Sequence, residues 1–203
     1  MVMNAVGLVG WVGGWLALLG VSTYQPDWVA LVFMPYFLYG FYRATVQLRY
    51  FPTAFRMRRI LRTYPWQILT DVPRGVGSHP GAQDDGPWVE LPNPADGAGP
   101  VPLVFISHLR SHWWLRHIGG PRTAPELKAR LEPLWFAGDP RFLGVVAVSR
   151  RAGNAPRRLH FLYQPQALGK ASPKQGWSAG SAELERARMA GARISDTASG
   201  MRR

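Results

Sequence analysis

Two apolar runs open the chain, with a short polar break between them. Val2 to Val21 contains no charged residue, and as a helix it would span about 30 Å, the thickness of a bilayer's hydrocarbon core. The break, Ser22 to Asp27, holds a proline and short polar side chains, which favour a turn. The second run, Trp28 to Tyr42, reaches full length only if Arg43 extends its side chain to the membrane surface. The pattern predicts a hairpin of two transmembrane helices over residues 1–50.

Residues 51–64 place apolar and basic side chains at helical spacing. On a helical wheel the apolar residues fall within about 120° of arc, and the basic residues lie opposite. The basic residues are Arg56, Arg58, Arg59 and Arg62, and the apolar ones are Ala54, Met57, Ile60, Leu61 and Tyr64. The pattern predicts a cationic amphipathic juxtamembrane helix that lies among anionic headgroups. The alternative is that the apolar stripe packs on the soluble domain and the arginines only set the topology.

From residue 65 the pattern changes to short runs rich in Val, Phe, Tyr and Trp, bounded by Gly, Pro and Asp. The predicted strands are Trp66–Val72, Trp88–Leu91, Val101–Ser107, Leu134–Ala137, Val145–Ser149 and Leu159–Tyr163. Turn residues between the last two strands predict a β-hairpin. The Gly/Pro-rich segment 74–100 is expected to be a loop, and Pro125–Leu131 a short helix.

Residues 166–203 contain few large apolar side chains, so they are expected to form a disordered basic tail. Within this tail Ser181 is placed to cap a brief helix that runs to Ala190. The predicted fold is therefore an α+β membrane protein. It joins a two-helix transmembrane hairpin to a small mainly-β cytoplasmic domain over residues 65–165, closed as a barrel or a sandwich.

The distribution of charge gives the predicted hairpin an orientation. The 203-residue chain has a formal net charge of +12, the turn between the two runs has no Lys or Arg, and arginines follow the second run from Arg43 onward. By the positive-inside rule, both termini lie in the cytoplasm of a multi-pass protein of the cell membrane. A cleaved signal peptide is the alternative for the first run, but that run has no basic n-region and no cleavage site before a soluble segment.

One run carries a resemblance to a known family. It reads Leu-Trp-Phe-Ala-Gly-Asp-Pro-Arg-Phe-Leu-Gly-Val-Val-Ala over Leu134–Ala147, and Arg62–Trp66 reads Arg-Thr-Tyr-Pro-Trp. With these motifs the chain resembles a family of actinobacterial two-span integral membrane proteins over residues 1–165. The resemblance implies the anchor and the domain, and it carries over no activity and no catalytic residue.

Three motifs in the sequence resemble chemical sites. Gly176–Gly180 matches the GxSxG pattern of serine hydrolases, but a polar segment precedes it and no histidine follows Ser178. His108, His112 and His117 have the spacing of metal ligands, but arginines surround them and no carboxylate is near. The pair Asp84-Asp85 lacks the other carboxylates of a calcium loop. The chain contains no cysteine, which excludes disulfides and thiolate metal sites. The sequence therefore predicts no catalytic, cofactor or metal site.

The arginines and two glycines are the candidate contact residues. Arg110 and Arg116 flank two tryptophans, while the tip of the predicted hairpin carries Arg150, Arg151, Arg157 and Arg158. Such clusters attract lipid headgroups, nucleic acid or acidic proteins, and lipid is nearest to an anchored domain. Gly10 and Gly14 form a GxxxG spacing, which predicts close helix packing, either in a homodimer or within the hairpin itself.

The sequence therefore favours a membrane-anchored cytoplasmic interaction or scaffold domain that docks an unidentified protein partner. Binding of anionic lipid or nucleic acid through the arginines is the alternative, and an enzyme is a third hypothesis.

Overall fold

The structure is a computed structural model. It describes residues 2–81, 86–95, 99–106, 111–119, 123–150, 153–169 and 179–194. The chain forms two compact units, Met1–Phe55 and Arg56–Arg203, which are described separately.

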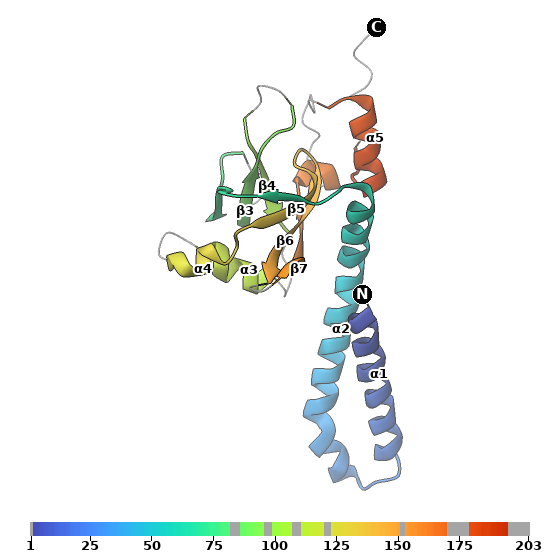
Figure 1. Ribbon diagram of the computed structural model, residues 1–203. Coiled ribbons are helices and arrows are strands. Elements are labelled where there is room, and N and C mark those ends of the chain that lie inside the picture. The colour runs from blue at the N-terminus through green and yellow to red at the C-terminus, as the bar shows by residue number, and fades with distance from the viewer. Residues whose placement is uncertain are drawn as a thin grey trace. The chain divides into compact units, whose positions relative to one another are not determined.

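The first unit is a helical hairpin made by α1 (Val2–Ser22) and the greater part of α2 (Asp27–Thr63) (Figure 1). Aromatic rings join the two helices: the ring centroids of Trp11 and Tyr36 are 5.7 Å apart, and those of Trp11 and Tyr39 are 5.4 Å apart. These pairs join the two antiparallel helices near Trp11.

One helix among the described residues is long and apolar enough to cross a membrane. It is α1, whose stretch Ala5–Ser22 has a mean hydropathy of 1.7 and no buried residue; an N-terminal signal sequence would have the same properties. The structure thus has the predicted helical hairpin but does not show two spans. The apolar run of α2 is too short, because Arg43 and Arg49 interrupt the hydropathy of the helix.

The second unit is built on one antiparallel sheet of seven strands that curls into a half-barrel (Figure 1). The strand order is β1-β5-β6-β7-β4-β3-β2. The strands are β1 (Gln67–Leu69), β2 (Arg74–Gly77), β3 (Gly86–Leu91), β4 (Val101–Phe105), β5 (Leu134–Asp139), β6 (Leu143–Arg150) and β7 (Gly153–Tyr163). The described strands therefore form a single open sheet in place of the predicted barrel or sandwich.

Every predicted strand has a counterpart in this sheet, and the predicted hairpin forms between β6 and β7. The strand β2 lies where a loop was predicted, so that prediction was wrong for Arg74–Gly77. Glycine has a low β-propensity, so a segment with two glycines carries no sequence signal for a strand. The pairing explains one of them, because a Cβ atom on Gly75 would lie 2.5 Å from Cζ2 of Trp88 on β3.

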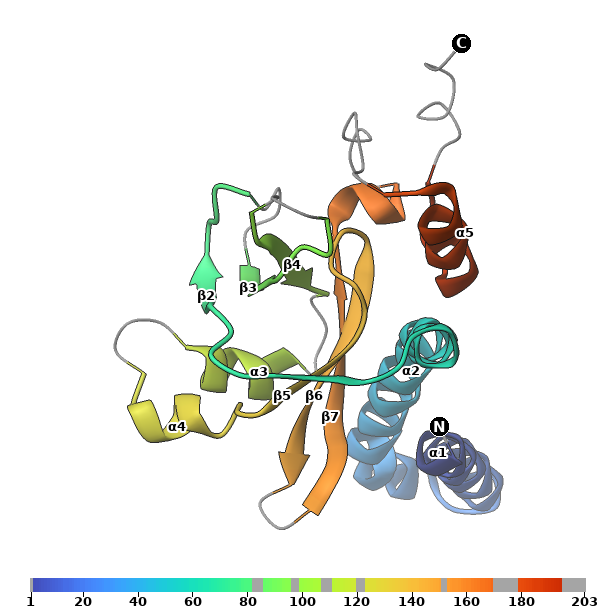
Figure 2. The same ribbon diagram turned by 45° about the horizontal axis from the view of Figure 1, so that its top comes forward.

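Helices lie on both faces of the sheet (Figure 2). On one face α3 (Ser111–Ile118) contributes Trp114 and Ile118 to the main core, and α4 (Pro125–Ala129) follows it. On the other face are the end of α2, from Arg56 onward, and α5 (Ser181–Ala190). The main core also contains Val72, Val89, Leu91, Leu103, Phe105, Leu131, Leu134, Phe136, Val146, Val148 and Leu162. Both faces of the central strands are therefore covered.

The end of α2 buries part of its apolar stripe. Ile60 is 0% exposed and Met57 is 5% exposed, whereas Arg58, Arg59 and Arg62 are exposed and Arg56 is partly buried. Leu61 and Tyr64 of the stripe are partly buried. Protein atoms therefore cover Met57 and Ile60, as the packing alternative expects.

Within the described residues, the region from residue 166 contains two helical segments. A 3-10 helix, η1, spans Pro165–Leu168, where a disordered tail was predicted. The helix α5 coincides with the brief helix predicted to run to Ala190, and it follows a segment that lies outside the described residues. The backbone N–H of Arg193 donates to the carbonyl of Ala167, with 2.7 Å between the nitrogen and the oxygen. Gly180 occupies the cap position predicted for Ser181, which is the first helical residue.

Candidate binding cavity

A cavity of about 370 Å³ opens in the second unit. Its lining residues come from β1, β3, β5, α5 and the connecting turns: Tyr64, Pro65, Gln67, Leu69, Leu91, Pro92, Asn93, Pro94, Phe136, Gly138, Asp139, Pro140, Arg141, Glu183 and Arg186. Strands β1 and β3 are far apart in the order of the sheet, yet both line this cavity. The curl of the half-barrel brings them together.

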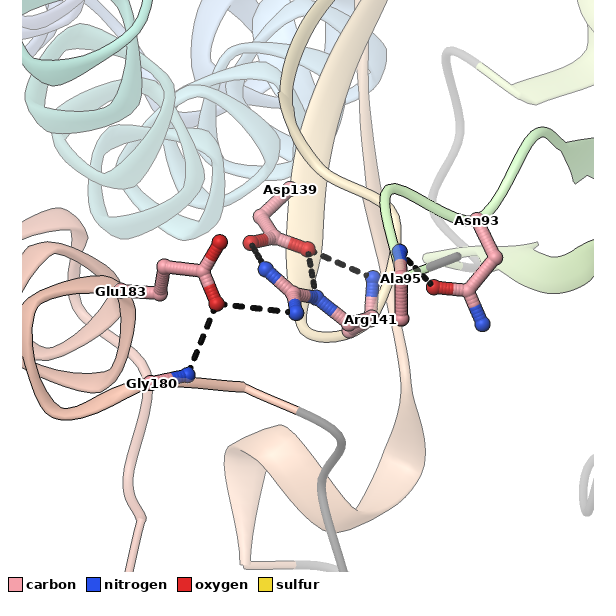
Figure 3. Close-up of polar contacts among 6 residues, drawn as sticks. All are labelled: Asn93, Ala95, Asp139, Arg141, Gly180 and Glu183. Atoms are coloured by element: carbon pink, nitrogen blue, oxygen red, sulfur yellow. Dashed lines mark hydrogen bonds and ion pairs between the residues drawn. The ribbon is translucent and has the colours of Figure 1, made fainter. Parts of the chain in front are cut away.

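A buried arginine at the cavity is held by two carboxylates (Figure 3). Nε and Nη2 of Arg141 donate to the two carboxylate oxygens of Asp139, at 3.0 and 2.7 Å. Its Nη1 lies 3.0 Å from Oε2 of Glu183 on α5. The side chain of Arg141 is 6% exposed, and that of Asp139 is 9% exposed. The two-pronged contact fixes the plane of the guanidinium group and aims its third nitrogen at α5.

The turn between β5 and β6 builds this arginine site. Oδ1 of Asp139 accepts a hydrogen bond from the backbone N–H of Arg141 at 3.0 Å, which orders the Asp-Pro-Arg turn. Gly138 has a φ of +148°, and a Cβ atom on it would lie 2.4 Å from the carbonyl oxygen of Leu143. A Cβ atom on Gly144 would lie 2.3 Å from the ring of Phe136. Both glycines are therefore required for the close approach of the two strands.

The hydrogen bonds of this site shift the pKa of both Arg141 and Glu183. The hydrogen bond from Arg141, and then the one from the backbone N–H of Gly180, lower the pKa of Glu183 below its ordinary value. The hydrogen bond to Asp139 raises the pKa of Arg141, although burial opposes this effect. The pair is therefore charged on both sides at neutral pH.

Tyr64 lies between the end of α2 and β1 and also lines the cavity. Burial, followed by the negative charge of Asp139, raises the pKa of its phenol to about 12. Its hydroxyl oxygen is buried and has no hydrogen-bond partner within the described residues. Tyr64 is thus neutral at physiological pH.

Two of the arginine clusters predicted from the sequence come together. The guanidinium carbon of Arg158 on β7 lies 4.4 Å from the ring centroid of Trp113 on α3, and the same helix carries the exposed Arg116. Arg157 is exposed beside Arg158. Arg110 and Arg151 lie outside the described residues, and only the backbone of Arg150 is described. The hairpin therefore contacts α3 through the pair of Arg158 and Trp113.

The other predicted candidates have structural roles or lie outside the described residues. The ring of His117 stacks on Trp113 at 4.0 Å, and its Nδ1 donates to the Trp113 carbonyl at 2.7 Å. His112 is exposed, while His108, Asp84-Asp85 and Ser178 fall outside the described residues. In the part of the chain that the structure describes, no group of three His, Cys, Asp or Glu residues is placed to hold a metal ion.

The two glycines of the GxxxG motif differ in their surroundings. A Cβ atom on Gly14 would lie 3.2 Å from the hydroxyl of Tyr36 on α2, whereas one on Gly10 would meet nothing within 4 Å. Gly14 therefore allows close packing inside the hairpin, and Gly10 does not contribute to it.

The residues of the cavity carry little signal in the sequence. Asp139 and Arg141 stood inside the motif of the resemblance, but nothing in that motif indicates that their side chains pair. Glu183 had one available signal, since an acidic residue three positions after Gly180 is typical of a helix start. The buried pair of Ser111 Oγ and His160 Nε2, 3.0 Å apart, had no sequence signal at all.

No protein family, curated protein or solved structure matches this chain.

Proposed function

We propose that the chain is a multi-pass protein of the cell membrane, with both termini in the cytoplasm, whose half-barrel binds a partner protein. Three features support the anchor: the apolar α1, the absence of Lys and Arg in the turn after it, and the arginines from Arg43 onward. We include α2 as a second span because α1 and α2 pair as a hairpin. The resemblance to actinobacterial two-span membrane proteins is consistent with this arrangement.

The cavity is the observation that carries the binding role. Its volume falls in the range of ligand sites, which runs from about 300 to 1,000 Å³. Four prolines, Leu69, Leu91 and Phe136 make most of the wall apolar, and a few charged groups stand at one end. A protein segment with apolar side chains fits these surroundings.

We favour binding over catalysis because the charged groups of the cavity are engaged with one another. Asp139 and Glu183 both contact Arg141, so neither carboxylate is placed as a free general base. The pair of Ser111 and His160 is buried and does not line the cavity.

A photo-crosslinking experiment in cells tests the binding role. A photoreactive amino acid is placed at Gln67 or at Asn93, both of which line the cavity, and at the exposed Glu126 on α4 as the control. We expect a discrete crosslinked product from the two cavity positions and none from Glu126. Equal products at all three positions, or none at any, would contradict a partner site at the cavity.

Carbonate washing and a reporter fused after Arg203 test the anchor. The full chain should stay with the membrane fraction, and the reporter should behave as cytoplasmic. Release into the aqueous fraction, or a reporter on the outer side, would rule out the proposed topology.

Binding of anionic lipid is a second candidate, favoured by the contact of Arg158 with Trp113, which brings two basic segments together. Nucleic acid could use the same charges. Salt-sensitive binding of the full chain to vesicles that contain phosphatidylserine would support lipid, provided that changing Arg157 and Arg158 to Ser abolishes it. Binding that does not depend on the anionic lipid would exclude this role.

A further inference from the structure

Glu183 occupies only one corner of the cavity. Its carboxylate meets Nη1 of Arg141 at 3.0 Å, and its side chain is 43% exposed. The apolar part of the cavity, lined by Leu69, Leu91 and Phe136, belongs to other elements. The cavity thus presents an arginine that binds a carboxylate, next to an apolar space that α5 does not supply.

Arg141 is prepared for this contact by the rest of the fold. Asp139 holds two of its nitrogens, and the ordered turn fixes the backbone of the arginine. The remaining nitrogen therefore points in one direction whether or not Glu183 is present. A preorganised guanidinium group binds an incoming carboxylate with little further loss of side-chain entropy.

The helix that supplies Glu183 is held by few large side chains. Its buried residues are Ala187 and Ala190, while Met189 is 58% exposed. Alanine side chains bury little apolar area, so they contribute little hydrophobic stabilisation. The charged contact with Arg141 and the backbone hydrogen bond from Arg193 are two polar contacts that help to hold α5 in place.

Displacement of α5 takes one specific contact away from Arg141. Glu183 and Arg186 both belong to α5, so they leave together, and Asp139 stays beside Arg141. Nη1 of Arg141 then loses the carboxylate that lies 3.0 Å from it. A segment that brings both a carboxylate and an apolar side chain would replace that contact and fill the apolar space.

From these observations we propose that the cavity recognises a carboxylate-bearing apolar segment of a partner protein, and that Glu183 of α5 is an internal competitor for the same arginine. This inference rests on the proposed binding function and specifies the chemistry of its partner. In the free protein α5 occupies the carboxylate position, and the partner displaces it.

Two blocked tripeptides that differ in one charge provide the test. Acetyl-Pro-Glu-Phe-amide and acetyl-Pro-Gln-Phe-amide are titrated into the full chain in detergent micelles, and dissociation constants are measured by ligand-observed NMR. We expect the Glu peptide to bind more tightly. The Glu183→Gln variant should bind it about tenfold more tightly than the wild type, the size expected for losing one charged hydrogen bond of the competitor.

Glu185 provides the matched control. It lies on the same helix, is 63% exposed and pairs with Arg188 instead of Arg141. The Glu185→Gln variant should therefore leave the dissociation constant unchanged. Because the chain has no cysteine, spin labels at Met189→Cys and Glu126→Cys can report α5 directly, and the distance between them should increase when the Glu peptide binds.

The outcomes separate the two proposals. Equal affinity for the two peptides, or a Glu183→Gln variant that binds like the wild type, would overturn the competition. If crosslinking at Gln67 persists in that case, the binding function stands and only the carboxylate chemistry is wrong. If crosslinking and peptide binding both fail, both proposals are wrong.

Discussion

Arg141 is a buried cation whose partners come from two elements of the second unit. Replacing it with Met leaves the Asp139 carboxylate, which is 9% exposed, without its countercharge. Removing one partner of a buried pair typically costs about 3 kcal/mol. We therefore predict a loss of about that size in the free energy of unfolding of Arg141→Met, measured by chemical denaturation in micelles.

The double variant Asp139→Asn with Arg141→Met is the control for this prediction. It should be less destabilised than the sum of the two single variants, because neither charge is then buried alone. Additive losses would show that the two side chains do not act as a pair.

Tyr64 illustrates the opposite case, a buried polar atom that gains nothing from the fold. Its hydroxyl has no partner within the described residues, so Tyr64→Phe should leave stability unchanged or raise it by up to about 1 kcal/mol. The raised pKa of about 12, against 10.0 for an ordinary tyrosine, means that folding favours the neutral phenol. The stabilisation that comes from keeping this phenol neutral is fully present below pH 10 and is lost as the pH rises through 12.

Thermal unfolding of the wild type and of Tyr64→Phe from pH 8 to pH 12 tests both the stability prediction and the raised pKa. The Phe variant should lose less stability above pH 10 than the wild type. A steeper alkaline loss in the variant would contradict the assigned burial of the phenol.

At the scale of elements, α5 is the helix whose docking depends on charge. The pKa of Glu183 is lowered in the folded chain, so its contribution is present above the ordinary value of 4.5 and is lost as the pH falls through the lowered pKa. We predict that α5 leaves its site in acid before the sheet unfolds. The distance between spin labels at residues 126 and 189 should increase below pH 4.5, while the circular dichroism of the sheet stays constant.

Glu183→Gln should remove this acid transition, because the amide does not titrate in that range. A transition of the same size in the Gln variant would assign it to another group.

The elements also show how much a pattern of residues can predict. The Val and aromatic content of β3 to β7, with Gly, Pro and Asp at their ends, predicted their existence, because these strands bury large side chains. The strand β2 has two glycines and so leaves no such signal, and it pairs with β3, where Trp88 lies opposite Gly75. The helix α5 buries only alanines, so the composition of this segment is similar to that of a solvated tail. Its position depends on Arg141, a contact that no local pattern encodes.

At the scale of the whole molecule, the positive-inside rule and the apolar α1 gave the predicted topology, while the cavity emerged only in three dimensions. Its walls come from segments as distant in the chain as Tyr64, Leu91, Asp139 and Glu183. Such a site depends on the curl of the sheet, which side-chain periodicity does not reveal.

The edges of the half-barrel have a further consequence. An open sheet ends in two strands with unpaired backbone groups, and these can recruit the same edge of a neighbouring molecule into fibrils. Here the edge strands β1 and β2 are three and four residues long, and one of them carries two glycines. Edge strands this short, with this weak a β-propensity, offer a second copy few backbone groups with which to pair. The open sheet therefore resists edge-to-edge aggregation even though the barrel is not closed.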